Sequence, residues 1–223
     1  MADHLAGSRF GKVIPPLSDA RKRLGYALRQ LGHDVVGHSA DDTLLDDLAD
    51  ALIAGSERLR AAAPRSRDVT GFHEHWNSDL AEGAPVPSYE DRPFTGVSSP
   101  WSIEPDVRRE GNGVRATMTF RAAHEGAPAR CHGGIVAGMF DDVLGSVLGV
   151  IGVGAFTGEL SVRYEAPVPL HRELVCRCRL DRADGRKLFL SGELSDGDQV
   201  LCRTTAIFIQ PRAAATQSTF DPN

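Results

Sequence analysis

The sequence predicts an α+β fold in which a curved antiparallel sheet wraps one central buried helix, preceded by an N-terminal helical extension. Three observations support this prediction: a helix-length apolar run at 132–150, one strand-like segment before it, and four strand-like segments after it at short spacing. Strands that alternated with helices would instead indicate a doubly wound parallel sheet. We expect the extension and an irregular connection over 1–99, the core domain over 100–212, and a disordered tail over 213–223.

Two amphipathic helices are expected in the extension. Ser18 can cap the first, and Ser39 followed by Asp42 has the spacing of a capping box for the second. Their apolar faces would hold Leu24, Leu28 and Leu31 in the first helix and Leu44, Leu48, Leu52 and Leu59 in the second. Residues 63–100 are rich in Pro and Gly, so they should form an irregular connection over the surface. It must bury four aromatic side chains, Phe72, Trp76, Tyr89 and Phe94.

The core domain begins with a strand that has a two-residue period. Its inward side chains would be Val114, Ala116, Met118 and Phe120. In the run 132–150, apolar residues cover most of the helix circumference, which indicates a buried central helix. Further strands are expected at 157–165, 173–182, 186–194 and 199–209, with turns at ADG (183–185) and SDGD (195–198).

The composition excludes several classes of protein. Hydrophobic residues make up 41% and charged residues 25%, which supports a sizeable core, and the net charge of −5 argues against nucleic-acid binding. The four cysteines contain no C-x-x-C pair and no signal peptide is evident, so we expect a reduced, cytoplasmic protein. The apolar run 135–156 is interrupted by Asp141, Asp142 and several glycines, so no membrane span is expected.

Other hydrolase and cofactor motifs are missing or out of context. G-x-S-x-G is absent, which argues against an α/β-hydrolase esterase. GVGAFTG (152–158) follows a helix rather than a strand, so it is no dinucleotide loop. HEH at 73–75 lacks the H-E-x-x-H spacing, and C-x-C at 176–178 is more typical of packing than of a metal site.

Three segments resemble hotdog-fold acyl-CoA thioesterases of the PaaI/THEM type, in the 4-hydroxybenzoyl-CoA thioesterase superfamily. They are HEGAPARCHGGIVAGMFDDVLG (124–145), TGELSVRYEAPVPL (157–170) and DRADGRKLFLSGEL (181–194), about half the chain together with the residues between them. The combination is more specific than its parts, because HGG is followed by an Asp nine positions after the His and then by a Thr-led strand that ends in Y-x-x-P-x-P-L.

The resemblance implies a set of site residues. Asp141 stands where the family has its catalytic carboxylate, Gly133 where a helix N-terminal amide polarises the thioester carbonyl, and Thr157 where a hydroxyl places the attacking water. One branch has an Asn at the position of Gly126, and His124 is the nearby candidate to replace it. By the same resemblance, Arg186 and Lys187 would lie near the coenzyme A phosphates, and Gly134 would contribute to substrate binding.

The physical chemistry of thioester hydrolysis agrees with these roles. The first amides of a helix lack intrahelical partners and favour negative charge, so Gly133 is suited to hold an oxyanion. A desolvated carboxylate has a raised pKa and is a better base, which suits Asp141 as general base or as nucleophile. Asp142 is offset by about 100° on the helix and is expected to be an exposed or interface acid. Met139 and Phe140 could be core residues or acyl-pocket lining.

The spacing within this helix predicts a dimer. Nine helical residues rise about 13 Å and turn through about 900°, so His132 and Asp141 would lie on opposite faces. A two-fold dimer could bring Gly133 of one subunit to Asp141 and Thr157 of the other. His132 could orient the site, cap the helix or transfer a proton, and the last role is the least favoured because the helix dipole disfavours the protonated imidazole.

The leading hypothesis is therefore an acyl-CoA thioesterase of lipid metabolism that releases a carboxylic acid and coenzyme A. It would need no metal and no cofactor other than the coenzyme A of its substrate, and would be a homodimer or a dimer of such dimers. A non-catalytic acyl-CoA-binding or sensing protein, and a hotdog hydratase or dehydratase, are the alternatives.

Overall fold

The computed structural model describes residues 17–65 and 80–212. Its helices are α1 (Asp19–Gly37), α2 (Asp42–Arg60), the short 3₁₀ helix η2 (Ala122–His124) and α3 (Gly133–Ile151). Its strands are β1 (Asp106–Glu110), β2 (Gly113–Thr119), β3 (Phe156–Tyr164), β4 (Glu173–Asp184), β5 (Lys187–Asp196) and β6 (Gln199–Ile209).

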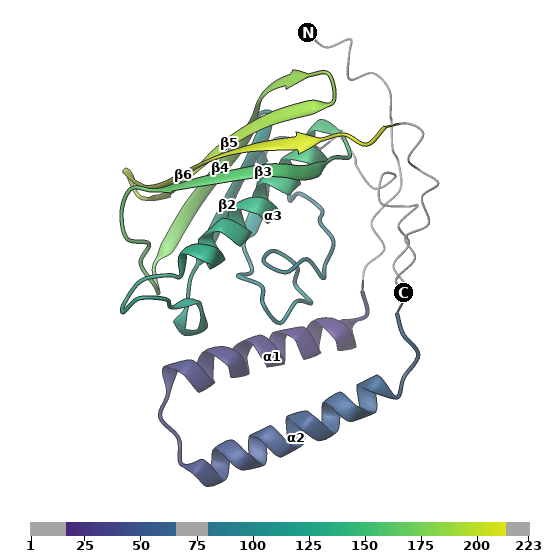
Figure 1. Ribbon diagram of the computed structural model, residues 1–223, viewed down its shortest axis with the longest axis vertical. Helices are drawn as coiled ribbons and strands as arrows, with labels where there is room; N and C mark the ends of the chain where they lie inside the picture. Colours follow the sequence, from purple (N-terminus) through teal and green to yellow (C-terminus); the bar gives the residue numbers. More distant parts are fainter. Residues whose placement is uncertain (1–16, 66–79, 213–223) are drawn as a thin grey trace.

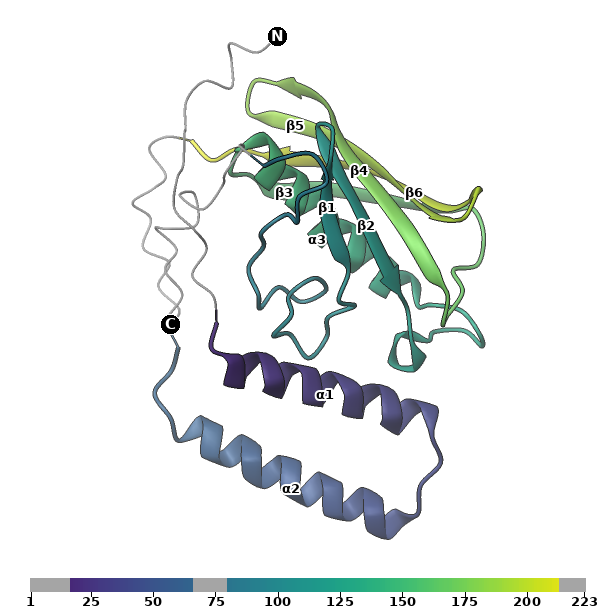
Figure 2. The same ribbon diagram turned by 180° about the vertical axis from the view of Figure 1, so that it is seen from behind.

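The six strands form one antiparallel sheet in the order β1-β2-β4-β5-β6-β3. After α3 the chain therefore enters at the far edge of the sheet as β3, and later returns next to β2 as β4. Figures 1 and 2 show the sheet curving around α3, with α1 and α2 lying apart from the sheet beyond the segment that precedes β1. This arrangement confirms the predicted α+β hotdog fold.

The core lies between α3 and the concave face of the sheet. The buried side of β2 supplies alternate residues, as its two-residue period predicts, and α3 is buried along most of its length. The largest fully buried side chains include Phe120, Phe140, Leu144, Leu174 and Leu188. Among the described residues α3 is the one helix long and apolar enough for a membrane span, but 61% of that window is buried inside the protein. Its hydropathy therefore reflects the core.

β1 is a strand that the sequence pattern does not reveal. Its five residues, DVRRE, contain a single apolar side chain, so no alternation is visible. The turns were predicted correctly: Gly185 and Gly197 both have positive φ, at 55° and 56°, in the two hairpins that join β4 to β5 and β5 to β6.

The extension differs from the prediction in the cap of its second helix. Ser18 caps α1 as expected, but Asp41 rather than Ser39 caps α2, and the Asp41 side chain accepts a hydrogen bond of 2.9 Å from the Leu44 N–H. The apolar faces of the two helices are not buried by the rest of the described chain, since Leu24 is 44% exposed and no residue of α2 is buried. α1 docks through Arg29 and through His33, both buried.

The buried Arg29 explains how a polar face can anchor a helix. Its guanidinium donates to the carbonyl oxygens of Val97 and Ser99 and forms an ion pair with Glu104. A buried charge is tolerated where it is paired and hydrogen-bonded. Within the connection, Tyr89 and Phe94 are half-buried. Predictions that concern Phe72, Trp76, the HEH segment and the tail 213–223 fall outside the described residues.

Candidate active site

Asp141 and Thr157 meet at the surface of the domain. The Thr157 hydroxyl donates to Oδ1 of Asp141 at 2.7 Å, joining the middle of α3 to the start of β3. The β3–β6 register shifts between Thr157 and Glu159, so a β-bulge at Gly158 lies directly beside the hydroxyl. Such bulges often re-aim a neighbouring side chain. The structure thus brings together the predicted carboxylate and the predicted hydroxyl within one chain.

The start of α3 holds the second group of predicted residues. His132 is the N-cap, and its Nδ1 accepts a hydrogen bond of 3.0 Å from the Gly134 N–H. The Gly133 N–H has no acceptor within residues 17–65 and 80–212. The Tyr164 hydroxyl donates to the Gly133 carbonyl oxygen at 2.5 Å. Of the two glycine amides, only that of Gly133 is therefore available to a ligand.

His132 has the capping role that was one of its three predicted alternatives. Its own N–H donates to the His124 carbonyl oxygen at 2.8 Å, which fixes the backbone that leads into α3. The hydrogen bond from Gly134 to Nδ1 therefore holds the imidazole ring over the first turn of α3.

The two groups lie at opposite ends of β3. Gly133 contacts Tyr164 at the end of the strand, whereas Asp141 contacts Thr157 at its start. Seven strand residues span roughly 23 Å, and eight residues of α3 span about 12 Å along its axis. One subunit therefore does not bring the Gly133 amide and the Asp141 carboxylate to the same carbonyl group.

The β3 edge is open. β3 pairs with β6 on one side, and no strand within residues 17–65 and 80–212 pairs with its other side. Its first and last side chains, Phe156 and Tyr164, are 52% and 49% exposed. A nine-residue edge strand with exposed aromatic side chains is a natural surface for pairing with another strand.

Arg186 lies in the turn between β4 and β5, and Lys187 is the first residue of β5. Lys187 pairs with Ile209 of β6, and Ile209 pairs in turn with Phe156 of β3. Two strand spacings of about 4.8 Å therefore separate Lys187 from the start of β3, which places this basic turn at the same end of the sheet as Thr157. The Arg186 side chain donates to the Gln210 carbonyl oxygen at 2.7 Å.

Asp142 is not the exposed or interface acid that was expected. Its Oδ2 accepts hydrogen bonds from the Phe94 N–H at 2.9 Å and from the Thr95 N–H at 3.0 Å, so it anchors the preceding connection to α3. Asp142 lies about 100° around α3 from Asp141, and its side chain therefore faces the segment before β1. The sequence pattern could not predict where that segment lies.

Arg92 is a charged neighbour of the site that sequence reasoning missed. Its guanidinium donates to the Asp142 carbonyl oxygen at 3.2 Å and packs against Gly145, where a Cβ would lie 3.2 Å from Nη1. Burial lowers the pKa of Arg92, and the carboxylates of Asp142 and Asp141 oppose that shift. Arg92 lies in an irregular segment with no periodic pattern, so no sequence signal marks it.

His124 does not replace the Asn that one branch of the family has near the site. Its imidazole is buried, accepts from the Arg121 N–H at 3.1 Å, and meets the ring of His33 edge-on at 4.7 Å. Burial, with smaller contributions from His33 and Arg121, lowers its pKa to about 4. The departure at Gly126 has a steric reason, because a Cβ there would lie 2.8 Å from Cα of His132.

Several other candidates are structural. Phe140 and Met139 have no exposed surface, so in this subunit they are core residues rather than pocket lining. The four cysteines are free and buried, and burial raises the pKa of Cys131 to about 12 and of Cys202 to about 11, which leaves them poor nucleophiles. No cluster of three or more His, Cys, Asp or Glu suited to a metal occurs in the described part of the chain.

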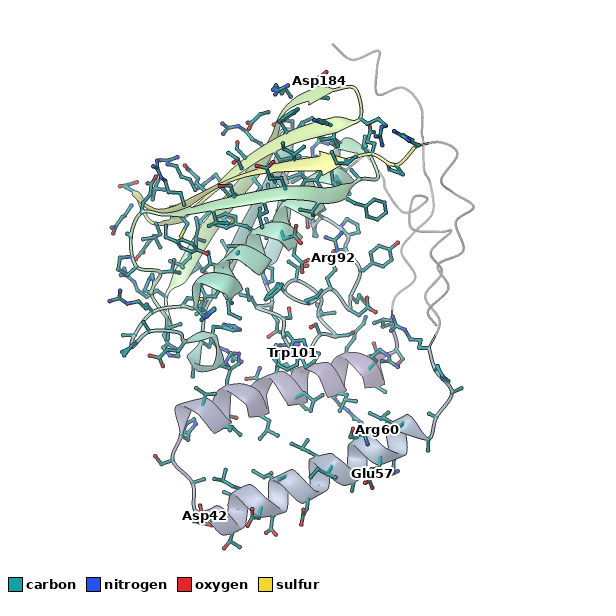
Figure 3. The ribbon with its side chains drawn as sticks, viewed as in Figure 1. Asp42, Glu57, Arg60, Arg92, Trp101 and Asp184 are labelled. Atoms are coloured by element: carbon teal, nitrogen blue, oxygen red, sulfur yellow. The ribbon has the colours of Figure 1, made fainter. Side chains whose placement is uncertain are left out.

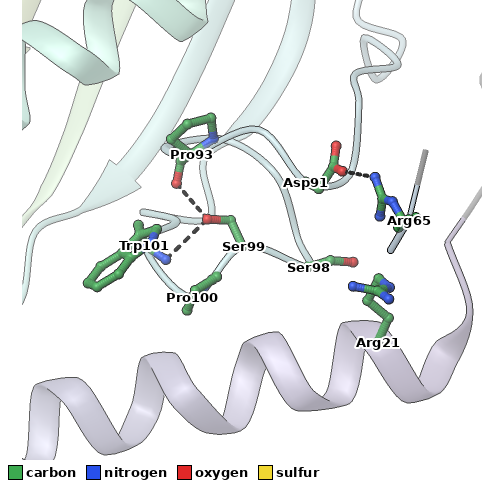
Figure 4. A pocket seen from close by; sticks show the side chains of 8 residues that line it. All are labelled: Arg21, Arg65, Asp91, Pro93, Ser98, Ser99, Pro100 and Trp101. Carbon is green, nitrogen blue, oxygen red and sulfur yellow. Dashed lines mark hydrogen bonds and ion pairs between the residues drawn. The ribbon is translucent and has the colours of Figure 1, made fainter. Parts of the chain in front are cut away.

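A pocket of about 400 Å³ lies between the start of α1 and the segment before β1 (Figure 4). None of the predicted site residues lines it; its walls include Arg21, Arg65, Ser98 and Trp101. This pocket therefore does not mark the reactive site in this subunit.

Comparison with known proteins finds similarity to thioesterases. The sequence model of the Thioesterase superfamily matches residues 129–203. Acyl-coenzyme A thioesterase THEM4 of Bos taurus is 38% identical over 89 residues, which are 39% of this chain and 36% of that protein. THEM4 of Xenopus laevis is 33% identical over 39% of this chain and 40% of its own length. This chain thus matches little more than a third of these relatives.

One solved structure extends over nearly the whole chain. RHA08564, a thioesterase superfamily protein, superposes with a TM-score of 0.71 at 24% identity, over 92% of this chain and 99% of its own. Similarity at this level of identity supports the fold, including the helical extension.

Proposed function

We propose that this chain, a hotdog-fold protein whose residues 129–203 form a thioesterase-superfamily domain, is an acyl-CoA thioesterase. It would hydrolyse an acyl-CoA to a free carboxylic acid and coenzyme A. The observation that supports this most strongly is the Asp141–Thr157 hydrogen bond of 2.7 Å, because it couples a carboxylate to a hydroxyl at the positions where the family has its catalytic pair.

The reaction needs an oxyanion donor and a base at the same carbonyl group. In the proposed site the thioester carbonyl oxygen accepts a hydrogen bond from the Gly133 N–H of one subunit, at the positive end of α3. Asp141 and Thr157 of the other subunit face the carbonyl carbon. The attacking oxygen adds to that carbon, and the tetrahedral intermediate collapses with loss of the coenzyme A thiolate.

Asp141 can serve this reaction in two ways. As a general base it takes a proton from water that the Thr157 hydroxyl helps to position, and the thiolate leaves as coenzyme A. As a nucleophile it adds directly to give an acyl anhydride, which water then hydrolyses. The half-buried guanidinium of Arg92 supplies positive charge near Asp141 in either case.

The proposed dimer forms through the β3 edges of two subunits. Antiparallel pairing of two β3 strands would place the Thr157 end of one strand beside the Tyr164 end of the other. Since Asp141 lies at the first end and Gly133 at the second, this pairing joins the two half-sites that one subunit holds apart. Two equivalent sites result from one two-fold axis.

Arg186 and Lys187 are proposed to bind the phosphates of coenzyme A. They lie at the sheet end that holds Thr157, and Lys187 is exposed. We further propose that Gly134 lets the substrate approach closely through its missing side chain, that no metal or redox cofactor takes part, and that the protein acts in the cytoplasm in lipid metabolism.

Release of free thiol from a panel of acyl-CoAs, measured with the wild type and with Asp141→Asn, tests the proposal. We expect turnover by the wild type on at least one chain length and a loss of at least 100-fold in kcat for Asp141→Asn. A wild type that binds coenzyme A esters but hydrolyses none would identify a non-catalytic binding protein. Full activity of Asp141→Asn would refute the catalytic assignment.

A further inference from the structure

The α1–α2 hairpin carries two apolar stripes with heptad spacing, and five of their eight side chains are exposed while Leu28, Leu31 and Leu48 are half-buried. The stripe residues are Leu24, Leu28, Leu31 and Val35 on α1, and Leu45, Leu48, Leu52 and Leu59 on α2. Steps of three, four and seven residues are those of the contact positions in a coiled coil. Leu52 is 44% and Leu59 is 63% exposed, and no α2 residue is buried. Helices with such stripes are stable when another apolar surface covers them.

The stripes do not serve to dock the hairpin on its own domain. α1 contacts the domain through Gly25, Arg29 and His33, a face about 130° around the helix from the leucine stripe. Gly25 approaches so closely that a Cβ would lie 2.2 Å from the Ser98 carbonyl oxygen. The leucine stripe of α1 is therefore left for a different contact.

The charges of the hairpin are separated along its length. Figure 3 labels Asp42 at one end of α2, and Glu57 and Arg60 at the other. The end formed by the start of α1 and the end of α2 has five basic side chains against two acidic ones, namely Arg21, Lys22, Arg23, Arg58 and Arg60 against Asp19 and Glu57. The opposite end has six acidic side chains and no Lys or Arg: Asp34, Asp41, Asp42, Asp46, Asp47 and Asp50.

This charge pattern is complementary to a reversed copy of itself. Consider a two-fold axis that is perpendicular to the helices and parallel to the plane of the hairpin. This axis would place α2 of a second copy antiparallel on α2 of the first, so that each basic end faces an acidic end. An anionic membrane surface would be repelled by the acidic end. Each helix of the hairpin has 19 residues and is therefore about 28 Å long, enough for each stripe to run along the whole interface.

We propose that the α1–α2 hairpin is an interface between copies of this chain, in which the leucine stripes of two hairpins form an antiparallel four-helix bundle. The interface is independent of the proposed thioesterase site, because it uses none of the residues in that site. It also lies on elements other than β3, so the two surfaces define separate two-fold contacts.

Light scattering with two matched variants tests the interface. Leu52→Glu adds a charge within the stripe, and Ala54→Glu adds the same charge to α2 about 160° away around the helix. Both side chains are exposed, so neither variant disturbs the fold of the subunit, which circular dichroism verifies. We expect the molar mass to halve for Leu52→Glu and to stay at the wild-type value for Ala54→Glu. A monomeric wild type, or equal masses for both variants, would overturn the proposal.

Disulfide formation tests the direction of packing. Leu45 and Leu59 lie seven residues on either side of Leu52, so antiparallel packing brings residue 45 of one copy near residue 59 of the other. Mixed Leu45→Cys and Leu59→Cys proteins should form the mixed disulfide dimer, while Ala54→Cys gives the background; the native cysteines are buried. Disulfides that join like positions only, or none above background, would contradict antiparallel packing.

Discussion

Replacing Gly133 by proline would remove the proposed oxyanion donor with little change to the helix. Gly133 is the first residue of α3, where proline is favoured because the N–H it lacks has no intrahelical acceptor. His132 precedes it with φ −65° and ψ 132°, the extended conformation that a residue before proline requires. The added Cβ would lie 3.2 Å from the hydroxyl oxygen of Tyr164, a half-exposed side chain that can shift by a few tenths of an ångström.

The expected loss follows from the strength of one such donor. Removing a single oxyanion hydrogen bond costs about 2.7–4 kcal/mol in the transition state, which corresponds to a fall of about 10²–10³-fold in kcat. Gly133→Ala is the matched control, because it adds the same Cβ against Tyr164 and keeps the N–H. Its kcat should remain within about tenfold of the wild type.

Steady-state thiol release gives kcat and KM for both variants, and thermal unfolding by circular dichroism shows whether each is folded. We expect the proline variant to lose kcat while its KM changes little, since the donor acts chiefly on the transition state. A folded Gly133→Pro protein whose kcat lies within about threefold of Gly133→Ala would show that the Gly133 amide does not hold the oxyanion.

Three further predictions concern neighbouring groups. Thr157→Val removes the hydrogen bond to Asp141 and should lower kcat by about tenfold or more. The control Thr157→Ser keeps the hydroxyl and should retain most of the activity. Equal kcat values for the two variants would contradict the role of the hydroxyl. Asp142→Ala leaves the N–H groups of Phe94 and Thr95 unpaired, so it should lower the free energy of unfolding in urea by roughly 2–4 kcal/mol. Its kcat should stay within a few-fold of the wild-type value. A large loss of kcat in the folded variant would mean that Asp142 takes part in the reaction. The pKa of His124 is about 4 in the folded protein and about 6.5 when unfolded, so its contribution to stability is full above pH 6.5 and is lost as the pH falls toward 4. The free energy of unfolding in urea, measured at pH 7 and at pH 4.5, should fall between these pH values by roughly 2–3 kcal/mol more in the wild type than in His124→Asn. Equal falls in the two proteins would contradict this role of His124.

Periodic segments made most of the hotdog domain predictable. β2 alternates buried and half-buried side chains, which predicts a strand with one buried face. α3 is apolar on most of its circumference, which predicts a buried central helix. β1 has one apolar side chain among five residues and is recognisable only from its pairing with β2. Local pattern cannot report pairing between distant segments.

The extension shows that an amphipathic pattern does not by itself identify the face through which a helix docks. The leucines mark the apolar face of α1, yet α1 docks through Arg29, whose charge is satisfied by two carbonyl groups and Glu104. Those partners lie about 70 residues further along the chain. A buried charge of this kind is defined by its partners, which only the folded structure brings together.

The candidate site also contains residues that could be predicted from the sequence and residues that could not. Family resemblance pointed to Asp141 and Thr157, and the structure places them 2.7 Å apart. The anchoring role of Asp142 and the position of Arg92 depend on how an aperiodic connection lies against α3, so neither could be predicted.

Subunit mixing tests the central claim most directly, because the proposed site takes Gly133 from one chain and Asp141 from the other. In a heterodimer of Asp141→Asn and Gly133→Pro, one site receives both wild-type residues and the other receives both substitutions. Co-refolding equal amounts should make half of the dimers mixed and restore about a quarter of wild-type activity from two nearly inactive parents. No activity above that of the parents in verified heterodimers would show that the two residues do not share a site.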